Sequence, residues 1–166
     1  MAGRSIGADE IKRDLRVPLF IIIGAMNEGA MSERVIIIHS LEQAVTALKA
    51  ARDLGRAVTL ASPPGAAAYT GALWFREVVK QAEREVPQAE VSSILDCGDK
   101  PGLVMAAFRQ GVLRVRFTGP KAAAEKLRAI AEAESHHLIT GPLDALDLLD
   151  VADKPQACRD WLAKEA

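Results

Sequence analysis

The sequence predicts a single-domain α/β fold with a mostly parallel sheet of about five to six strands flanked by helices. Short runs of Val, Ile and Leu alternate with longer segments whose apolar residues recur at helical spacing. Gly, Pro and Ser separate the two kinds of segment. A strand and its helix repeat after roughly thirty residues or fewer, which is typical of βαβ units with right-handed crossovers.

Two arrangements fit this pattern. A three-layer, doubly wound sheet, flavodoxin-like or Rossmann-like, is the prediction, and a partial (β/α) barrel-like arrangement is the alternative. A chain of 166 residues suits one domain and is short for a complete barrel of about 250 residues. We expect residues 34–166 to form the α/β domain. Residues 1–33 would form an N-terminal extension with a short helix and a strand at Leu19–Ile23.

The first strand–helix unit of the domain has clear boundaries. The continuous apolar run Val35–Ile38 predicts a strand that is buried on both faces. Ser40 followed by Gln43 is a capping-box pattern that predicts the start of a helix, and Gly55 predicts its end.

The next two strands are predicted at Ala57–Ala61 and Val91–Leu95, with a long helix between them. Ser62–Gly65 ends the earlier strand, and the helix is expected over residues 67–85. Its buried side is expected to consist of Trp74, Phe75, Val78, Val79 and Ala82.

A fourth strand is predicted at Val112–Phe117, after a helix that begins near Pro101. Arg114 and Arg116 alternate with apolar residues, so one face of this strand is polar. The pattern indicates either an edge strand or arginines that reach into a site.

The remaining elements are shorter. We expect a helix after Pro120, a strand at Leu138–Thr140, a turn or short helix at Leu143–Leu149, and a last helix over residues 155–164.

Composition limits the partners of the chain. Its net charge of −1 argues against nucleic-acid binding. The apolar runs are too short to span a bilayer, so no membrane is expected. Cys97 and Cys158 lack the spacing of a zinc site and are expected to be free thiols, which favours a cytoplasmic location.

Chemistry is expected where the carboxyl ends of the parallel strands meet, because ligands bind at that edge of an open sheet. Asp96 and His39 are the candidate catalytic residues there. The candidate ligand-binding residues follow the same strands and are Ser62, Gly65, Gly98, Asp99, Lys100, Arg116, Thr118 and Gly119.

Structural alternatives exist for these residues. Asp96 would bond loop amides, Asp99 would cap a helix, and His39 would be a hydrogen-bonded loop residue. Ser62–Gly65 would be a turn, since two prolines remove amide donors. Cys97 would either react as a thiolate at a helix N-terminus or pack as a small apolar residue.

A second acidic group recurs at every third residue, at Asp144, Asp147, Asp150 and Asp153. On a helix these carboxylates would form a solvated face. A hard cation is the alternative, without the Gly and terminal Glu of an EF-hand loop.

The segment Met105–Gly111 and the following strand and turn, Val112–Pro120, resemble a helix–strand step of (β/α)8-barrel aldolases of the keto-deoxy-phosphogluconate type. In those aldolases a lysine on the strand forms a Schiff base. The comparable strand here offers Arg114 and Arg116, which cannot form one. The resemblance therefore implies a barrel-like step and gives no support to aldolase activity.

Two functions follow. The first is binding of a small anionic metabolite at the carboxyl-end edge, with or without catalysis. The alternative is a non-catalytic homo-oligomeric or partner-binding module, based on Leu19–Ile23 and on an exposed Trp74 or Trp161. A homo-oligomer is compatible with both functions, and the sequence indicates no particular cofactor.

Overall fold

A computed structural model describes residues 34–164. The predicted helix and strand of the N-terminal extension lie outside this range. The strands are β1 (Val35–Ile37), β2 (Val58–Ala61), β3 (Val91–Asp96), β4 (Arg114–Arg116), β5 (His137–Ile139) and β6 (Ala145–Asp147). The helices are α2 (Leu41–Leu54), the short 3-10 helix η2 (Ala66–Ala68), α3 (Ala72–Glu85), α4 (Pro101–Arg109), α5 (Lys121–Ala133) and α6 (Lys154–Ala163).

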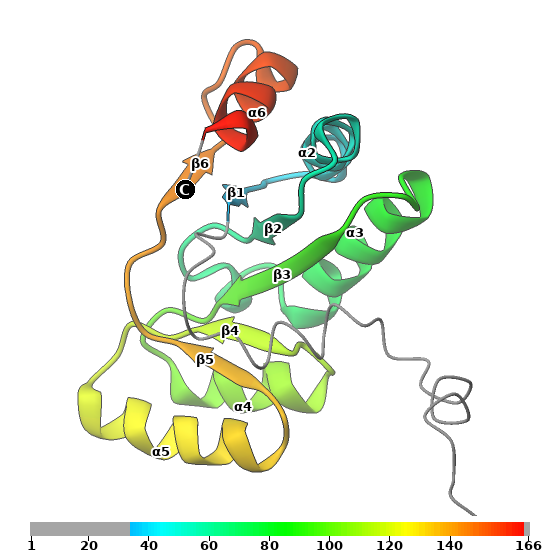
Figure 1. Cartoon of the computed structure of the whole chain (residues 1–166). Coiled ribbons are helices and arrows are strands. Elements are labelled where there is room, and N and C mark those ends of the chain that lie inside the picture. Colours follow the sequence, from blue (N-terminus) through cyan, green and yellow to red (C-terminus); the bar gives the residue numbers. More distant parts are fainter. Residues whose placement is uncertain (1–33, 165–166) are drawn as a thin grey trace, which may run out of the picture. The chain divides into compact units, whose positions relative to one another are not determined.

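The predicted α/β class with a parallel sheet is confirmed. Six strands form one sheet in the order β5-β4-β3-β2-β1-β6, and every pair is parallel (Figure 1). From β1 to β5 each new strand is added on the same side of the previous one. Right-handed crossovers in one direction place the intervening helices on one face of the sheet.

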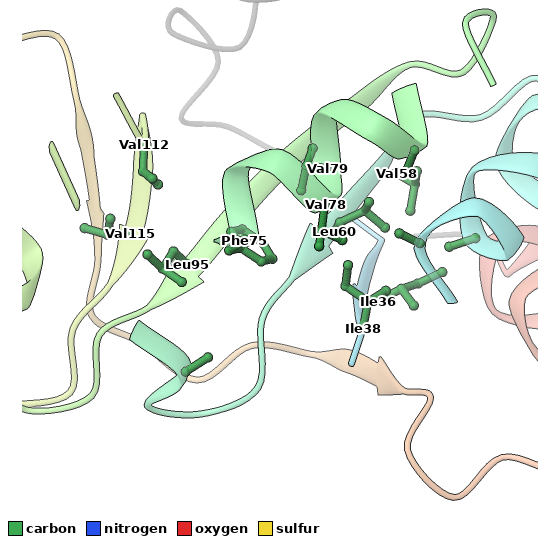
Figure 2. Close-up of a cluster of buried hydrophobic side chains, with 14 of the residues drawn as sticks. Ile36, Ile38, Val58, Leu60, Phe75, Val78, Val79, Leu95, Val112 and Val115 are labelled. Carbon is green, nitrogen blue, oxygen red and sulfur yellow. The ribbon is translucent and has the colours of Figure 1, made fainter. Parts of the chain in front are cut away.

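Packing agrees with this winding. The main core joins residues from all the described helices to one sheet face, which carries Ile36, Leu60, Leu95 and Val115 (Figure 2). The opposite face, here called the inner face, carries a separate cluster of Val35, Ala61 and Ile94. Among residues 34–164 no helix contributes to that cluster. The winding therefore matches the partial barrel-like alternative more closely than a sheet with helices on both faces, and the sheet is not closed.

The link between the two edge strands shows that the sheet is curved. Residues 140–144 join β5 to β6, which lie at opposite edges. Six Cα–Cα steps span at most about 21 Å, whereas six flat strands measure about 24 Å across. Leu143 of the link packs against the inner-face cluster. The two edges therefore curl towards the inner face, and the link crosses that face.

The predicted start and end of the helix in the first strand–helix unit are confirmed. The Ser40 hydroxyl accepts a hydrogen bond from the Gln43 amide at 3.2 Å, as the capping box predicts. Gly55 ends α2 with φ +59°, a left-handed conformation that favours glycine.

The helix predicted over residues 67–85 is interrupted. Gly71, with φ +80°, separates η2 from α3. Phe75, Val78, Val79 and Ala82 are buried as predicted, but Trp74 is 44% exposed. Adjacent residues on a helix point about 100° apart, so Trp74 lies to the side of the buried stripe that contains Phe75.

One other prediction was wrong, and one of two alternatives is excluded. The segment predicted as a turn or short helix at Leu143–Leu149 contains strand β6, which pairs with β1. β4 is not an edge strand, because it lies between β3 and β5. Its polar residues face the inner side of the sheet, where Arg116 pairs with a residue of β3.

No helix within residues 34–164 has the length and apolar character needed to cross a membrane.

Candidate functional site

The carboxyl ends of the strands bring the predicted site residues to one edge. Asp96 and Arg116 are paired in register as the last residues of β3 and β4. Ser62 follows the end of β2, and His39 lies two residues after the end of β1. We call this edge of the inner face the rim. The prediction that these residues share one edge is consistent with this register.

Asp96 is the centre of the contacts at the rim. Its side chain is only 4% exposed. Oδ1 accepts hydrogen bonds from the backbone amides of Gly65 at 2.7 Å and Gly98 at 2.8 Å. Oδ2 lies 2.6 Å from Nη1 of Arg116, and the Asp96 amide donates to the Ser62 hydroxyl at 2.8 Å. One buried carboxylate therefore joins the loops after β2 and β3 to strand β4.

Arg116 extends this network to the link over the inner face. Its Nε donates to the backbone oxygen of Gly141 at 3.0 Å. The side chain is 18% exposed. Within residues 34–164 its Nη2 makes no hydrogen bond.

These contacts favour the structural alternative for Asp96. A general base needs a free lone pair directed at the substrate, and three of the four acceptor positions of this carboxylate are already taken by hydrogen bonds. The geometry makes Asp96 a positioning residue that fixes the loops around it. Its predicted catalytic role stays a prediction.

Gly65, Gly98 and Thr118 form the neighbouring part of the rim. Gly65 and Gly98 both have left-handed φ angles, +68° and +57°. A side chain at Gly98 would lie 3.6 Å from Cα of Gly65, so these backbones run close together. The Thr118 amide donates to the Gly98 oxygen at 2.8 Å, and Thr118 itself is exposed. The structure therefore brings these three predicted residues together with Ser62.

The other predicted ligand-binding residues are Asp99, Lys100 and Gly119. Asp99 and Lys100 are exposed and contact each other, with Lys100 Nζ 3.0 Å from Asp99 Oδ1. The hydrogen bond from Lys100 and its charge lower the pKa of Asp99. Asp99 does not cap α4, whose N-cap is Lys100. A side chain at Gly119 would lie 2.9 Å from two carbons of the Phe117 ring, so this glycine makes room for Phe117.

His39 pairs with a residue of β6. Its Nε2 lies 2.7 Å from Oδ1 of Asp147 in β6. The side chain of Gln43 joins the same two segments. Its Oε1 accepts a hydrogen bond from the His39 amide, and its Nε2 donates one to the Leu148 oxygen. The carboxylate orients the imidazole, as in acid–base pairs. No hydrogen bond or ion pair within residues 34–164 joins His39 to Asp96, and β2 separates their strands.

Asp147 and Gly141 were not predicted as site residues. Asp147 appeared as one of four acidic residues on a helical face, and that helix is absent. Asp153 is instead the N-cap of α6, where it accepts from the Gln156 amide at 3.0 Å. The described residues hold no group of three or more His, Cys, Asp or Glu side chains that could bind a metal ion.

Cys97 follows Asp96 in the chain and is buried in the main core. Burial, and to a lesser extent the negative charge of Asp96, raise the pKa of this thiol to about 12. Burial raises the pKa of Cys158 to about 11. A reactive thiolate has a lowered pKa, whereas the pKa of both thiols is raised. The structure therefore favours the packing alternative for Cys97.

Both thiols should therefore resist a thiol reagent in the folded protein. At pH 8 a free cysteine with a pKa of about 8.5 is partly ionised, whereas the two native thiols stay protonated and covered. We expect slow labelling by Ellman's reagent under native conditions and rapid labelling of two thiols in denaturant. Rapid stoichiometric labelling of the native protein, lost in Cys97→Ser, would contradict this account.

Comparison with known proteins gives a limited likeness. No family model matches the chain. The chain is similar to the fructose-bisphosphate aldolase class 2 of Synechocystis sp., with 25% identity over 116 residues. The matched part is 70% of this chain and 32% of the aldolase, so the chain spans about a third of that protein's length.

Proposed function

We propose that the rim binds a small anionic metabolite. The observation that carries this proposal is the Asp96–Arg116 pair, which holds the loops after β2 and β3 and the link to β6 around one point. A rigid rim of this kind positions donors before a ligand arrives, which lowers the entropic cost of binding. The available donors are Nη2 of Arg116, the Thr118 hydroxyl and the Lys100 ammonium.

The likeness to the aldolase supports the same class of ligand. That protein is named for a sugar that carries two phosphates, and sugar phosphates are small anions. The likeness covers too little of the aldolase to carry over its reaction. Catalysis at the rim, with His39 oriented by Asp147, is a further prediction, as is the cytoplasmic location of the protein.

Isothermal titration calorimetry with fructose bisphosphate, inorganic phosphate and uncharged fructose tests the proposal. We expect the phosphorylated sugar to bind and fructose to give no heat. Thr118→Ala and Lys100→Ala should each weaken binding by about tenfold, the effect of removing one hydrogen bond to a charged group. Their melting temperatures should equal that of the wild type, because both side chains are exposed.

Lys80→Ala is the matched control, since Lys80 is an exposed lysine in the middle of α3 and pairs with Glu77. It should leave the affinity unchanged. The proposal would be wrong if neither phosphate compound gave heat on titration. It would also be wrong if neither Thr118→Ala nor Lys100→Ala weakened binding.

A second function, self-association, is favoured by a different observation. Tyr69, Leu73 and Trp74 are large side chains exposed on the helix-covered side of the molecule. Contiguous exposed apolar residues commonly mark protein interfaces.

A further inference from the structure

The His39–Asp147 pair at the rim is held in place from both sides. Nε2 of His39 lies 2.7 Å from Oδ1 of Asp147, and the two side chains are 21% and 46% exposed. The same Oδ1 accepts a hydrogen bond from the Leu149 amide at 2.9 Å. The Gln43 side chain joins the His39 amide to the Leu148 oxygen. Contacts besides the one between the two side chains therefore fix both members of the pair.

The second ring nitrogen of His39 is open. Its Nδ1 makes no hydrogen bond within residues 34–164 and is reached by solvent, whereas Nδ1 of His136 is buried without a partner. Because Nε2 faces a carboxylate, the proton of the neutral ring lies on Nε2, and Nδ1 carries a lone pair. When Nδ1 takes up a proton, the Asp147 carboxylate stabilises the imidazolium that forms. This is the arrangement of a general base with its orienting carboxylate.

The pair lies on the same face of the sheet as Arg116. Asp147 and Arg116 are the last residues of β6 and β4. Their register partners, Ile37 and Ile139, both pack against the inner-face cluster, so both side chains belong to the inner face. Nη1 of Arg116 lies 2.6 Å from Asp96 in β3, and β1 is two strand spacings from β3, about 10 Å in a flat sheet. A ligand several atoms long can therefore contact both the cation and the base.

We propose that His39 is the general base of a proton-transfer reaction on the anion that binds at the rim, an inference that rests on the proposed function. The substrate class is a phosphorylated ketose in its open-chain form, with its phosphate held at Arg116. An imidazole is a weak base, so the proton that it removes from carbon is one next to the carbonyl group.

The reaction is balanced without an oxidant or a reductant. Nδ1 of His39 takes the proton, and the electron pair of the C–H bond becomes a new C=C bond. The π electron pair of the carbonyl group moves to its oxygen, whose negative charge lies beside the new imidazolium. Return of a proton from Nδ1 to the carbon restores the carbonyl group. In deuterium oxide the ring proton exchanges with solvent, so deuterium enters the sugar.

Deuterium exchange followed by proton NMR tests this reaction. Fructose bisphosphate is incubated with the full chain in deuterium oxide, and the hydrogens on the two carbons that flank its carbonyl group are measured. The wild type should replace them by deuterium. His39→Gln should slow the exchange by about a hundredfold or more, the usual contribution of a general base, and should bind the sugar in calorimetry as the wild type does.

His137→Gln is the matched control. His137 is an exposed histidine and the first residue of β5, so it lies at the end of the sheet opposite the rim. This variant should exchange at the wild-type rate.

Asp147 is the positioning residue in this account, and the ring nitrogens of His39 report on it. Asp147→Ala should slow the exchange by about tenfold, as the loss of a carboxylate that orients a histidine commonly does. A nitrogen–proton spectrum of the imidazole should show the proton on Nε2 in the wild type and on either nitrogen in this variant. Asp150→Ala removes an exposed carboxylate three residues further on and should change neither result.

The outcomes separate this inference from the proposed function. Binding of fructose bisphosphate without exchange would overturn the role of His39 and leave the proposed function standing. The absence of binding would overturn both. Exchange that His39→Gln does not slow, or a neutral wild-type ring that carries its proton on Nδ1, would overturn this inference alone.

Discussion

Replacing Asp96 by asparagine is expected to lower the free energy of unfolding by about 3 kcal/mol, the cost of leaving one member of a buried ion pair without its partner. The change keeps the size of the side chain but removes its charge. The amide oxygen can still accept from Gly65 and Gly98, so the loss falls on the bond to Arg116, whose side chain is 18% exposed. For a domain of this size the melting temperature should fall by roughly 6–12 °C.

Asp99→Asn is the control for this prediction. It removes the same charge three residues away, from an exposed carboxylate whose ion pair within residues 34–164 is with Lys100 alone. Thermal and urea unfolding of both variants measure the difference. We expect the Asp99 variant to unfold like the wild type. Equal stability of the Asp96 variant and the wild type would mean that the Asp96–Arg116 pair does not hold the rim together.

Gly119→Ala is the second change with a large expected effect. The added methyl group would lie 2.9 Å from two carbons of the Phe117 ring, and Phe117 is completely buried. The ring must move within the core, which typically costs about 1–3 kcal/mol. Urea unfolding should show a lower midpoint with an unchanged slope.

Gly102→Ala is the control for the Gly119 prediction. Gly102 lies in α4, and a methyl group there would contact nothing within 4 Å. Alanine is the better helix former by about 0.5–1 kcal/mol, so this variant should match or exceed the wild type in stability. If both alanine variants had the same stability, crowding against Phe117 would not be the reason for a glycine at position 119.

Local patterns predicted the units of this fold but not the side on which its helices lie. The run Val35–Ile38, the Ser40 cap and Gly55 each act through neighbouring residues, and each prediction was accurate to about a residue. Whether helices cover one face or both depends on strand order. That order follows from contacts between distant segments, and the local periodicity of the sequence carries no information about such contacts.

The difference between local patterns and long-range contacts also explains which site residues were predicted and which were not. Asp96 was predicted as a site residue because it follows a clear strand signal, and Arg116 because it lies near the end of one. Asp147 was assigned to a helical face because β6 has only three residues, too few to show a period of two. Its contact with His39 joins residues 108 positions apart. Trp74 was assigned to the core because it stands four residues before Val78, which is helical spacing. The buried stripe of α3 instead passes through Phe75 and leaves Trp74 at its side.

The amide proton resonances of Gly65 and Gly98 test the central claim most directly. Both amides donate to a carboxylate oxygen of Asp96, and a charged acceptor makes such bonds shorter and stronger than a neutral one does. In a nitrogen–proton correlation spectrum of Asp96→Asn, both resonances should move upfield by far more than that of Gly102. Resonances of Gly65 and Gly98 that stay at their wild-type positions would show that Asp96 does not join these loops.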